Sequence, residues 1–194
     1  DEAAAPGYLD TIHGSVALIG VVSTMMNIAA IAGRQSRRVP GRPGVNGLRI
    51  DEKIIVTKEQ FNFIQNLAAE SCINAKDDIS RAEGFSPALP EGILALQALR
   101  FELGDRTQYE THPNKADMDR IKKYVYEAKM ASDYVIISMH SHELSGNNKE
   151  NPGDFYVEFA HNCIDEGAHA VIGHGPHILR PLEIYKGRPI FYSL

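Results

Sequence analysis

Residues 134–142 read YVIISMHSH, and residues 171–177 read VIGHGPH. Each stretch is an apolar run, rich in β-branched residues, that ends in two closely spaced histidines. Such runs are typical of parallel strands that are covered on both faces. Four of the eight histidines of the chain lie in these two pieces: His140, His142, His174 and His177. Because the carboxyl ends of parallel strands meet at one edge of a sheet, the two pieces together predict a metal site at that edge.

The segments around these two runs predict a fold of the α/β class. Residues 14–24 are expected to form a further buried strand, followed by a short apolar helical piece to Ala32. Towards the carboxyl terminus, a helix is expected over 114–132 and a strand over 133–139. A second helix is expected to begin at Asn151-Pro152 and to end at Gly167, followed by a strand over 168–172. The strand–helix–strand order of 133–172 predicts a right-handed βαβ crossover.

Other stretches carry weaker signals. Thr57 and Gln60 have capping-box spacing, and the helix behind them is expected to turn one face inward, formed by Phe61, Ile64, Leu67 and Ala68. Residues 77–92 predict an exposed loop, and residues 96–103 fit a strand or a helix equally well. The last residues predict a β-hairpin, with strands over 182–185 and 189–192.

Composition limits the class of protein. A chain of 194 residues with 43% hydrophobic and 23% charged residues is expected to be a single globular domain with its own core. A net charge of −5 argues against general binding of nucleic acid or anionic membranes. Cys72 and Cys163 are too few for a disulfide framework or a cysteine-based zinc site, and we expect two buried thiols. The apolar stretch over 15–32 fits a strand and a helix better than a membrane span.

The residues at the end of the first run have different expected roles. Neutral imidazole is a good ligand for Zn, Mn, Fe or Ni. His140 follows its strand directly and is the better ligand candidate of its pair. His142 and Glu143 lie one step further along the chain. They are candidates for residues that contact the metal ligands, or for residues that contact the substrate. The alternative for all of these residues is an ordinary loop side chain that is solvated or hydrogen-bonded.

The two histidine pieces, read with their surroundings, resemble the CapA family of capsule or poly-γ-glutamate synthesis proteins. The resemblance rests on DYVIISMHSHE at 133–143 and on GAHAVIGHGPHILRPLEIYKGRPIFYSL at 167–194. The stretches YLDTIHGSVALIGVVST at 8–24 and GRPGVNGLR at 41–49 are also similar to that family. The resemblance implies a calcineurin-like metallophosphatase fold, a sandwich of mixed sheets flanked by helices, with residues 1–194 forming one such domain.

The resemblance also implies a set of site residues. A complete site of the family would hold two divalent ions, with Mn, Fe or Zn not distinguished by the sequence. His140 matches the single histidine after the penultimate core strand, and His174 and His177 match the histidines of the glycine–histidine motif near the end. His142 and Glu143 are then candidates for positioning a leaving group or a proton during attack of water on a phosphoryl-type ester.

The chain departs from the family pattern at both ends. An early glycine–aspartate pair and an asparagine–asparagine–histidine segment, which supply metal ligands in the family, are not found. The family's continuation after YSL is cut off at Leu194. From these departures we expect a fragment, lacking the amino-terminal part of the domain, that binds metal only partially and is weak or inactive as a catalyst.

Partners and substrates are expected from the same resemblance. Arg37, Arg38 and Arg42 form a basic loop suited to an anionic substrate, with Arg38 and Arg42 as the binding candidates; the alternative is a solvated surface turn. The expected partners are an anionic small molecule or polymer and other capsule-synthesis components, with membrane contact only through segments outside the chain. The family suggests an extracytoplasmic or membrane-associated parent. Two further interpretations remain open: a non-catalytic component that binds or escorts an anionic polymer, and a domain whose histidines hold one structural ion.

Overall fold

The computed structural model describes residues 3–25 and 27–194. The chain divides into two compact units, one made of Asp1–Asp51 with His112–Leu194 and the other of Glu52–Thr111. Each unit has its own sheet. In the described part of the chain, no helix has both the length and the apolar composition that crossing a membrane requires.

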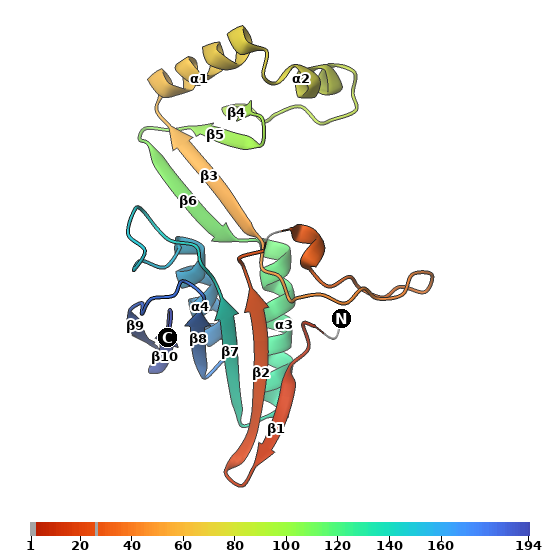
Figure 1. Ribbon diagram of the computed structural model, residues 1–194, viewed down its shortest axis with the longest axis vertical. Coiled ribbons are helices and arrows are strands. Elements are labelled where there is room, and N and C mark those ends of the chain that lie inside the picture. Colours follow the sequence, from red (N-terminus) through yellow and green to blue (C-terminus); the bar gives the residue numbers. More distant parts are fainter. Residues whose placement is uncertain (1–2, 26) are drawn as a thin grey trace. The chain divides into compact units, whose positions relative to one another are not determined.

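The first unit is built on a mixed six-stranded sheet in the order β1-β2-β7-β8-β10-β9 (Figure 1). Its strands are β1 (Gly7–Thr11), β2 (Gly14–Val22), β7 (Tyr134–His140), β8 (Ala170–His174), β9 (Leu182–Tyr185) and β10 (Arg188–Phe191). The four central strands are parallel to their neighbours, whereas the outer strands β1 and β9 run antiparallel. Helices and parallel strands in this order confirm the predicted α/β class.

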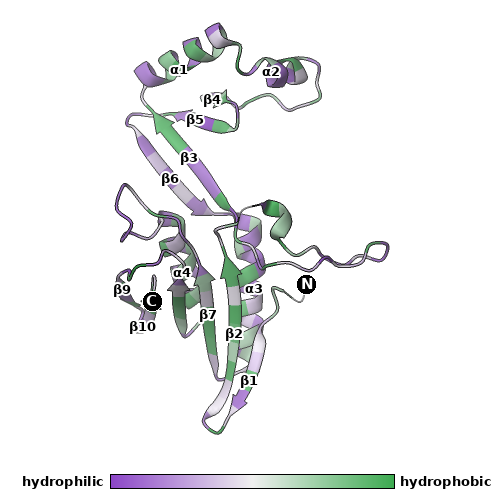
Figure 2. Cartoon of the chain, in the orientation of Figure 1, coloured by the Kyte–Doolittle hydropathy of each residue, from purple (hydrophilic) through white to green (hydrophobic). Residues whose placement is uncertain are grey.

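Two helices, α3 (Lys115–Ala131) and α4 (Asp154–Glu166), pack against this sheet. Their predicted inward faces are confirmed, because the following side chains are buried: Met118, Ile121, Val125, Ala128, Phe155, Phe159, Cys163 and Ile164. They meet the buried set of the central strands, which includes Ile19, Val135, Ile137 and Val171. Figure 2 shows β2 and β7 as mainly hydrophobic. The core of this unit therefore lies between the sheet and these helices.

The opposite face of the sheet differs from the prediction. Burial alternates along β7, where Val135, Ile137 and Met139 are fully buried while the residues between them are partly exposed. Leu18 of β2 and Tyr134 of β7 each remain 50% exposed. The apolar runs that predicted strands covered on both faces are thus covered on one face only within the described residues, because α3 and α4 lie on the same side.

Helix α4 begins two residues later than predicted. Its N-cap is Gly153, because Pro152 instead pairs with Leu144 in an isolated antiparallel bridge. The predicted stop at Gly167 is confirmed, with φ 127° at that residue. The predicted terminal hairpin is also confirmed as β9 and β10, whose two-residue turn places Lys186 and Gly187 at positive φ. Helix α4 joins the parallel strands β7 and β8, as the predicted βαβ order requires.

The segment between β2 and β3 contains little regular structure. A 3-10 turn, η1 (Ile28–Ala30), takes the place of the predicted helical piece to Ala32, of which Met26 lies outside the described residues. Asn27 caps this turn by accepting from the Ala29 amide. The chain then extends as a narrow loop, closed by reciprocal backbone hydrogen bonds between Gly33 and Arg42. The loop points away from the sheet of its unit (Figure 1).

The second unit combines a four-stranded sheet, in the order β4-β5-β3-β6, with two helices. Its elements are β3 (Ile50–Val56), α1 (Lys58–Ser71), α2 (Ala75–Ala82), β4 (Ile93–Leu96), β5 (Leu99–Leu103) and β6 (Gln108–Pro113). The capping box of Thr57 and Gln60 is confirmed. The ambiguous stretch 96–103 is a hairpin that turns at Gln97, with φ 54°.

Three expectations for this unit are wrong. Residues 77–82 are helical, because α2 carries Asp77 and Asp78 in its first turn and pairs Arg81 with Asp78. No residue of α1 is fully buried, and Leu67, predicted to face inward, is 45% exposed. Cys72 is exposed at the end of α1, while Cys163 is buried as expected.

Candidate metal centre

His140 and His174 face each other at the ends of two neighbouring strands. The register of the parallel strands β7 and β8 pairs His140 directly with His174. Their Nδ1 atoms lie 3.1 Å apart. The Nε2 atom of His174 lies 3.1 Å from Oγ of Ser138, which precedes His140 by one period of the same strand face. The structure therefore brings together the first histidine of each predicted pair.

The second histidine of each pair extends the cluster. The His142 ring centroid lies 4.9 Å from that of His140 and 5.4 Å from that of His177. Burial lowers the pKa of His142, and the neighbouring His140 and His177 lower it further. His177 adopts a left-handed backbone conformation, with φ 59°, in the turn after β8. All four histidines thus form one continuous row of rings.

Glu143 lies beside the row but is occupied by hydroxyl groups. Oε2 accepts from Ser23 at 2.7 Å and from Ser141 at 2.9 Å, and Oγ1 of Thr24 donates at 2.9 Å. Burial alone would raise the pKa of Glu143, but hydrogen bonds, led by that from Ser23, hold it below its usual value. Oγ1 of Thr24 in turn accepts the amide of His142 at 2.7 Å. The carboxylate therefore joins the end of β2 to the segment that follows β7.

The donor set fits part of a metal site. Two imidazole nitrogens bound to one tetrahedral ion at about 2.0–2.1 Å each would lie roughly 3.3 Å apart, close to the 3.1 Å between His140 and His174. Among the residues that the structure describes, however, no group of three or more His, Cys, Asp or Glu side chains is arranged to hold an ion. The two imidazole nitrogens therefore have a spacing compatible with two ligands of one ion, without a third such side chain arranged beside them in the described residues.

An open depression adjoins the histidine pair. It measures about 320 Å³, and its lining includes Ser138, His140 and His174 on one side and Gly20, Gly44 and Asn46 on the other. Asn46 is 5% exposed and donates to the Gly20 carbonyl at 2.9 Å. Sequence reasoning missed Ser138 and Asn46. The signal for Ser138 was its place two residues before His140 in a strand, which puts both on one face.

In the described part of the chain, the hydrogen bonds of Arg38 and Arg42 go to residues of the loop and its base rather than to the histidines. Arg42 donates to the Ile31 carbonyl at 2.7 Å, at the base of the loop. Arg37 and Arg38 are exposed, and the amide of Arg38 bonds to Oγ of Ser36. The candidate binding residues Arg38 and Arg42 therefore lie on the projecting loop. The residues that follow the loop, Gly44–Asn46, line the depression beside the histidines.

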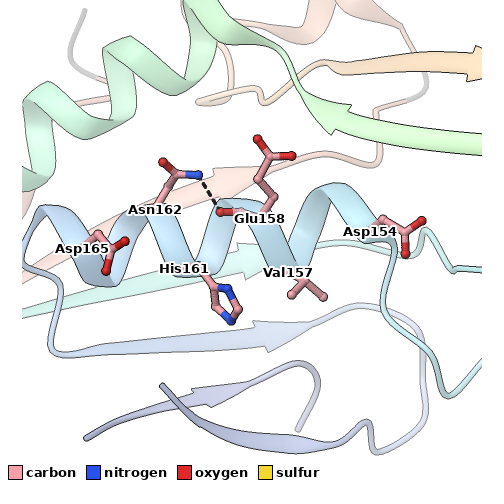
Figure 3. Close-up of a pocket in the computed structure, with 6 residues that line it drawn as sticks. All are labelled: Asp154, Val157, Glu158, His161, Asn162 and Asp165. Atoms are coloured by element: carbon pink, nitrogen blue, oxygen red, sulfur yellow. Dashed lines mark hydrogen bonds between the residues drawn. The ribbon is translucent and has the colours of Figure 1, made fainter. Parts of the chain in front are cut away.

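A second, open depression of about 460 Å³ runs along α4 (Figure 3). It is lined by Asp154, Val157, Glu158, His161, Asn162 and Asp165. His161 stacks on Tyr185 and lies 2.9 Å from Glu183, while Asp165 accepts from Lys186 and Tyr185. His161 and Asp165 are thus engaged by residues of the β9–β10 hairpin, whereas the histidine row gathers four imidazole rings at the ends of β7 and β8 and is the better candidate site.

Comparisons with known proteins point to one family. The sequence profile described as "Bacterial capsule synthesis protein PGA_cap" matches residues 1–194. The uncharacterized protein y4sH of Sinorhizobium fredii is 34% identical over 193 residues, which are 100% of this chain and 39% of that protein. PGA biosynthesis protein CapA of Bacillus subtilis is 37% identical over 79 residues, 41% of this chain and 20% of that protein. A probable polyglutamine synthesis accessory protein of Mycobacterium tuberculosis is 43% identical over 75 residues, 39% of this chain and 19% of that protein.

Proposed function

The chain belongs to the bacterial capsule synthesis protein family PGA_cap, and we propose that it carries the histidine side of a divalent-metal site in a phosphoesterase-type hydrolase. This family belongs to the calcineurin-like superfamily, and the mixed sheet and helices of the chain are consistent with a partial fold of that kind. The chain spans 39% of the length of y4sH. The reaction of the whole protein is therefore part of the proposal, with capsule or poly-γ-glutamate synthesis as its setting.

The observation that carries the proposal is the pairing of His140 with His174. Strand register pairs the two residues, and their Nδ1 atoms lie 3.1 Å apart, close to the roughly 3.3 Å expected for two nitrogens that share one tetrahedral ion. His177 is the third ligand candidate at the end of the row. A divalent ion held here would supply Lewis acidity to a phosphoryl oxygen and lower the pKa of water. Manganese, iron and zinc all remain candidates.

The other site residues have supporting roles in this proposal. His142 touches the rings of His140 and His177, so it is placed to exchange a proton with a leaving group bound beside them. Glu143 acts through others: its carboxylate orients Thr24, which holds the His142 amide. The open depression beside His140 would receive the reacting group, and Arg38 and Arg42 would attract an anionic polymer to the projecting loop.

Metal content per chain tests the proposal. Elemental mass spectrometry of the 194-residue chain should find about one ion, held by the proposed half-site of nitrogen ligands. A His174→Ala/His177→Ala double variant should lose it. The matched control, His13→Ala, removes an exposed histidine in the turn between β1 and β2 and should keep the ion. An ion that survives the double variant would contradict the proposed ligands.

A binding role without catalysis is the second candidate. It is favoured by the engagement of the Glu143 carboxylate with the hydroxyl groups of Ser23 and Ser141. In that case the chain would bind or escort an anionic cell-surface polymer. Binding of poly-γ-glutamate with and without a chelator separates the two roles, because polymer binding that is unaffected by metal removal favours the escort. Phosphoester turnover by the full-length protein that disappears in His174→Ala favours the enzyme.

A further inference from the structure

One buried side chain, Arg180, joins the two loops that carry the outer histidines. Arg180 lies in the segment after β8 that also contains His177, and it is 7% exposed. Its Nε donates to the Lys149 carbonyl at 3.0 Å, and its Nη2 lies 3.4 Å from the His142 carbonyl. Both acceptors belong to the segment after β7. The guanidinium group is therefore the link between the backbone of His142 and the loop of His177.

The link is anchored at its own base. The amide of Arg180 donates to the Ser193 carbonyl at 3.2 Å, and the neighbouring Pro181 carbonyl accepts from the Tyr192 amide. These bonds tie the Arg180 backbone to the residues that follow β10. A planar guanidinium held in this way fixes two carbonyls in one geometry, whereas a lysine ammonium on a flexible stem would not.

Electrostatics add to the case for a specific role. Burial lowers the pKa of Arg180, while Tyr156 and Glu143 act in the opposite direction. Nη1 of Arg180 is buried and has no hydrogen-bond partner among the described residues. Burying an incompletely paired charge is costly. A neutral side chain of similar shape would fill the same space with a smaller desolvation cost. The geometry that the guanidinium group imposes on the two loops therefore explains why an arginine stands here.

We propose that Arg180 is a positioning residue that holds His142 and His177 in contact at the end of the histidine row. His140 and His174 do not depend on it, because strand register fixes them. The consequence for metal affinity rests on the proposed function, whereas the consequence for ring contact does not. The row thus consists of two halves: strand register brings His140 and His174 together, and Arg180 holds His142 and His177.

The test uses Arg180→Lys, with Arg188→Lys as the matched control. Arg188 also donates to two backbone carbonyls, those of Gly167 and Ala168, but at the opposite end of β8. Nuclear Overhauser contacts between histidine rings are measured in the metal-free chain. We expect Arg180→Lys to lose the His142–His177 contact and to keep the His140–His174 contact, while Arg188→Lys keeps both. Retention of the His142–His177 contact in Arg180→Lys would overturn the proposal, as would its equal loss in both variants.

Metal titration separates this inference from the proposed function. If the site binds metal, Arg180→Lys should raise the Kd for Mn²⁺ or Zn²⁺ about 10–100-fold, the range for groups that orient ligands, and Arg188→Lys should leave it unchanged. If the wild-type chain binds no metal while Arg180→Lys loses the His142–His177 contact, the positioning role is supported and the metal site is rejected. An unchanged Kd in an Arg180→Lys chain that has lost the ring contact would reject His177 as a ligand and leave the positioning role standing.

A wild-type measurement covers the case in which Arg180→Lys does not fold. The Nε proton of Arg180 should exchange with solvent far more slowly than those of the exposed Arg37 and Arg38, because it is buried in its bond to Lys149. Exchange at the same rate as those exposed side chains would overturn the proposal, since a mobile guanidinium cannot position the loops.

Discussion

The Nδ1 atoms of His140 and His174 lie 3.1 Å apart because strand register pairs these two residues across β7 and β8. Backbone pairing of the sheet, rather than a loop contact, thus brings these two histidines together. Any change that alters how β8 lies beside β7 or α4 should therefore change the site, even at residues that cannot bind metal themselves. The loops that follow the strands add the outer histidines and depend on separate contacts.

Gly173→Ala should destabilise the fold and disturb His174. A Cβ at Gly173 would clash with the Tyr156 hydroxyl and the Tyr192 carbonyl, because both oxygens would lie closer to it than van der Waals contact allows. Overpacking of this kind costs about 1–3 kcal/mol, which urea unfolding would measure. Gly20→Ala is the control, because a Cβ there has no neighbour within 4 Å. Equal stability of the two variants would show that the close approach of Tyr156 does not constrain β8.

Glu143→Gln should lower the free energy of unfolding by about 1–3 kcal/mol, because donors from Ser23, Thr24 and Ser141 would lose their charged acceptor. The folded pKa of Glu143 is depressed, so its contribution is present above the unfolded pKa of about 4.3 and is lost as pH falls through the folded value. The difference between wild type and variant should therefore shrink in acid. Glu150→Gln, at an exposed position, is the control and should show no such difference at any pH.

His169 should make stability depend on pH near neutrality. Its Nδ1 accepts the Val135 amide at 3.0 Å, so the ring is neutral with its proton on Nε2. Burial lowers the pKa of His169, and Arg188 and Lys129 lower it further. The contribution is therefore complete above the unfolded pKa of about 6.5 and falls as pH drops below it. His169→Asn keeps an acceptor but cannot titrate.

Urea unfolding between about pH 7 and pH 5 checks the role of His169. The variant should show a flatter dependence of the unfolding free energy on pH than the wild type. His13→Asn, in an exposed turn, should keep the wild-type dependence. Identical slopes for wild type and His169→Asn would contradict the bond to Val135.

The sequence predicted those features that depend on local pattern or on strand ends. The runs before His140 and His174 are long, apolar and β-branched, so both strands and their convergence could be predicted. The Lys186-Gly187 turn likewise has a local signal. Strand β3 could not be predicted with the same ease, because three charged residues in IDEKIIV interrupt its pattern. Glu143 could not be placed, because its partner Ser23 is 120 residues away in sequence.

The uncovered face of the sheet also lay beyond sequence pattern. An apolar run such as SVALIGVV has the same composition whether one face or both faces are covered. Only the placement of α3 and α4 on one side distinguishes the cases. The residues that this leaves partly or largely exposed include Val16, Leu18, Tyr134, Ile136 and Ile172.

Leu18→Lys should reduce self-association of the chain without unfolding it. Leu18 is 50% exposed in the middle of the uncovered face, and contiguous exposed apolar surface promotes association. The variant should change the free energy of unfolding by no more than about 0.5 kcal/mol, as surface substitutions usually do. Its neighbour provides the contrast, since Ile19 is fully buried and Ile19→Ala should cost about 2–5 kcal/mol. Light scattering over a concentration series, together with urea unfolding, measures both effects. Unchanged scattering in Leu18→Lys would show that this face does not drive association, and a large loss of stability would show that the face is covered in solution.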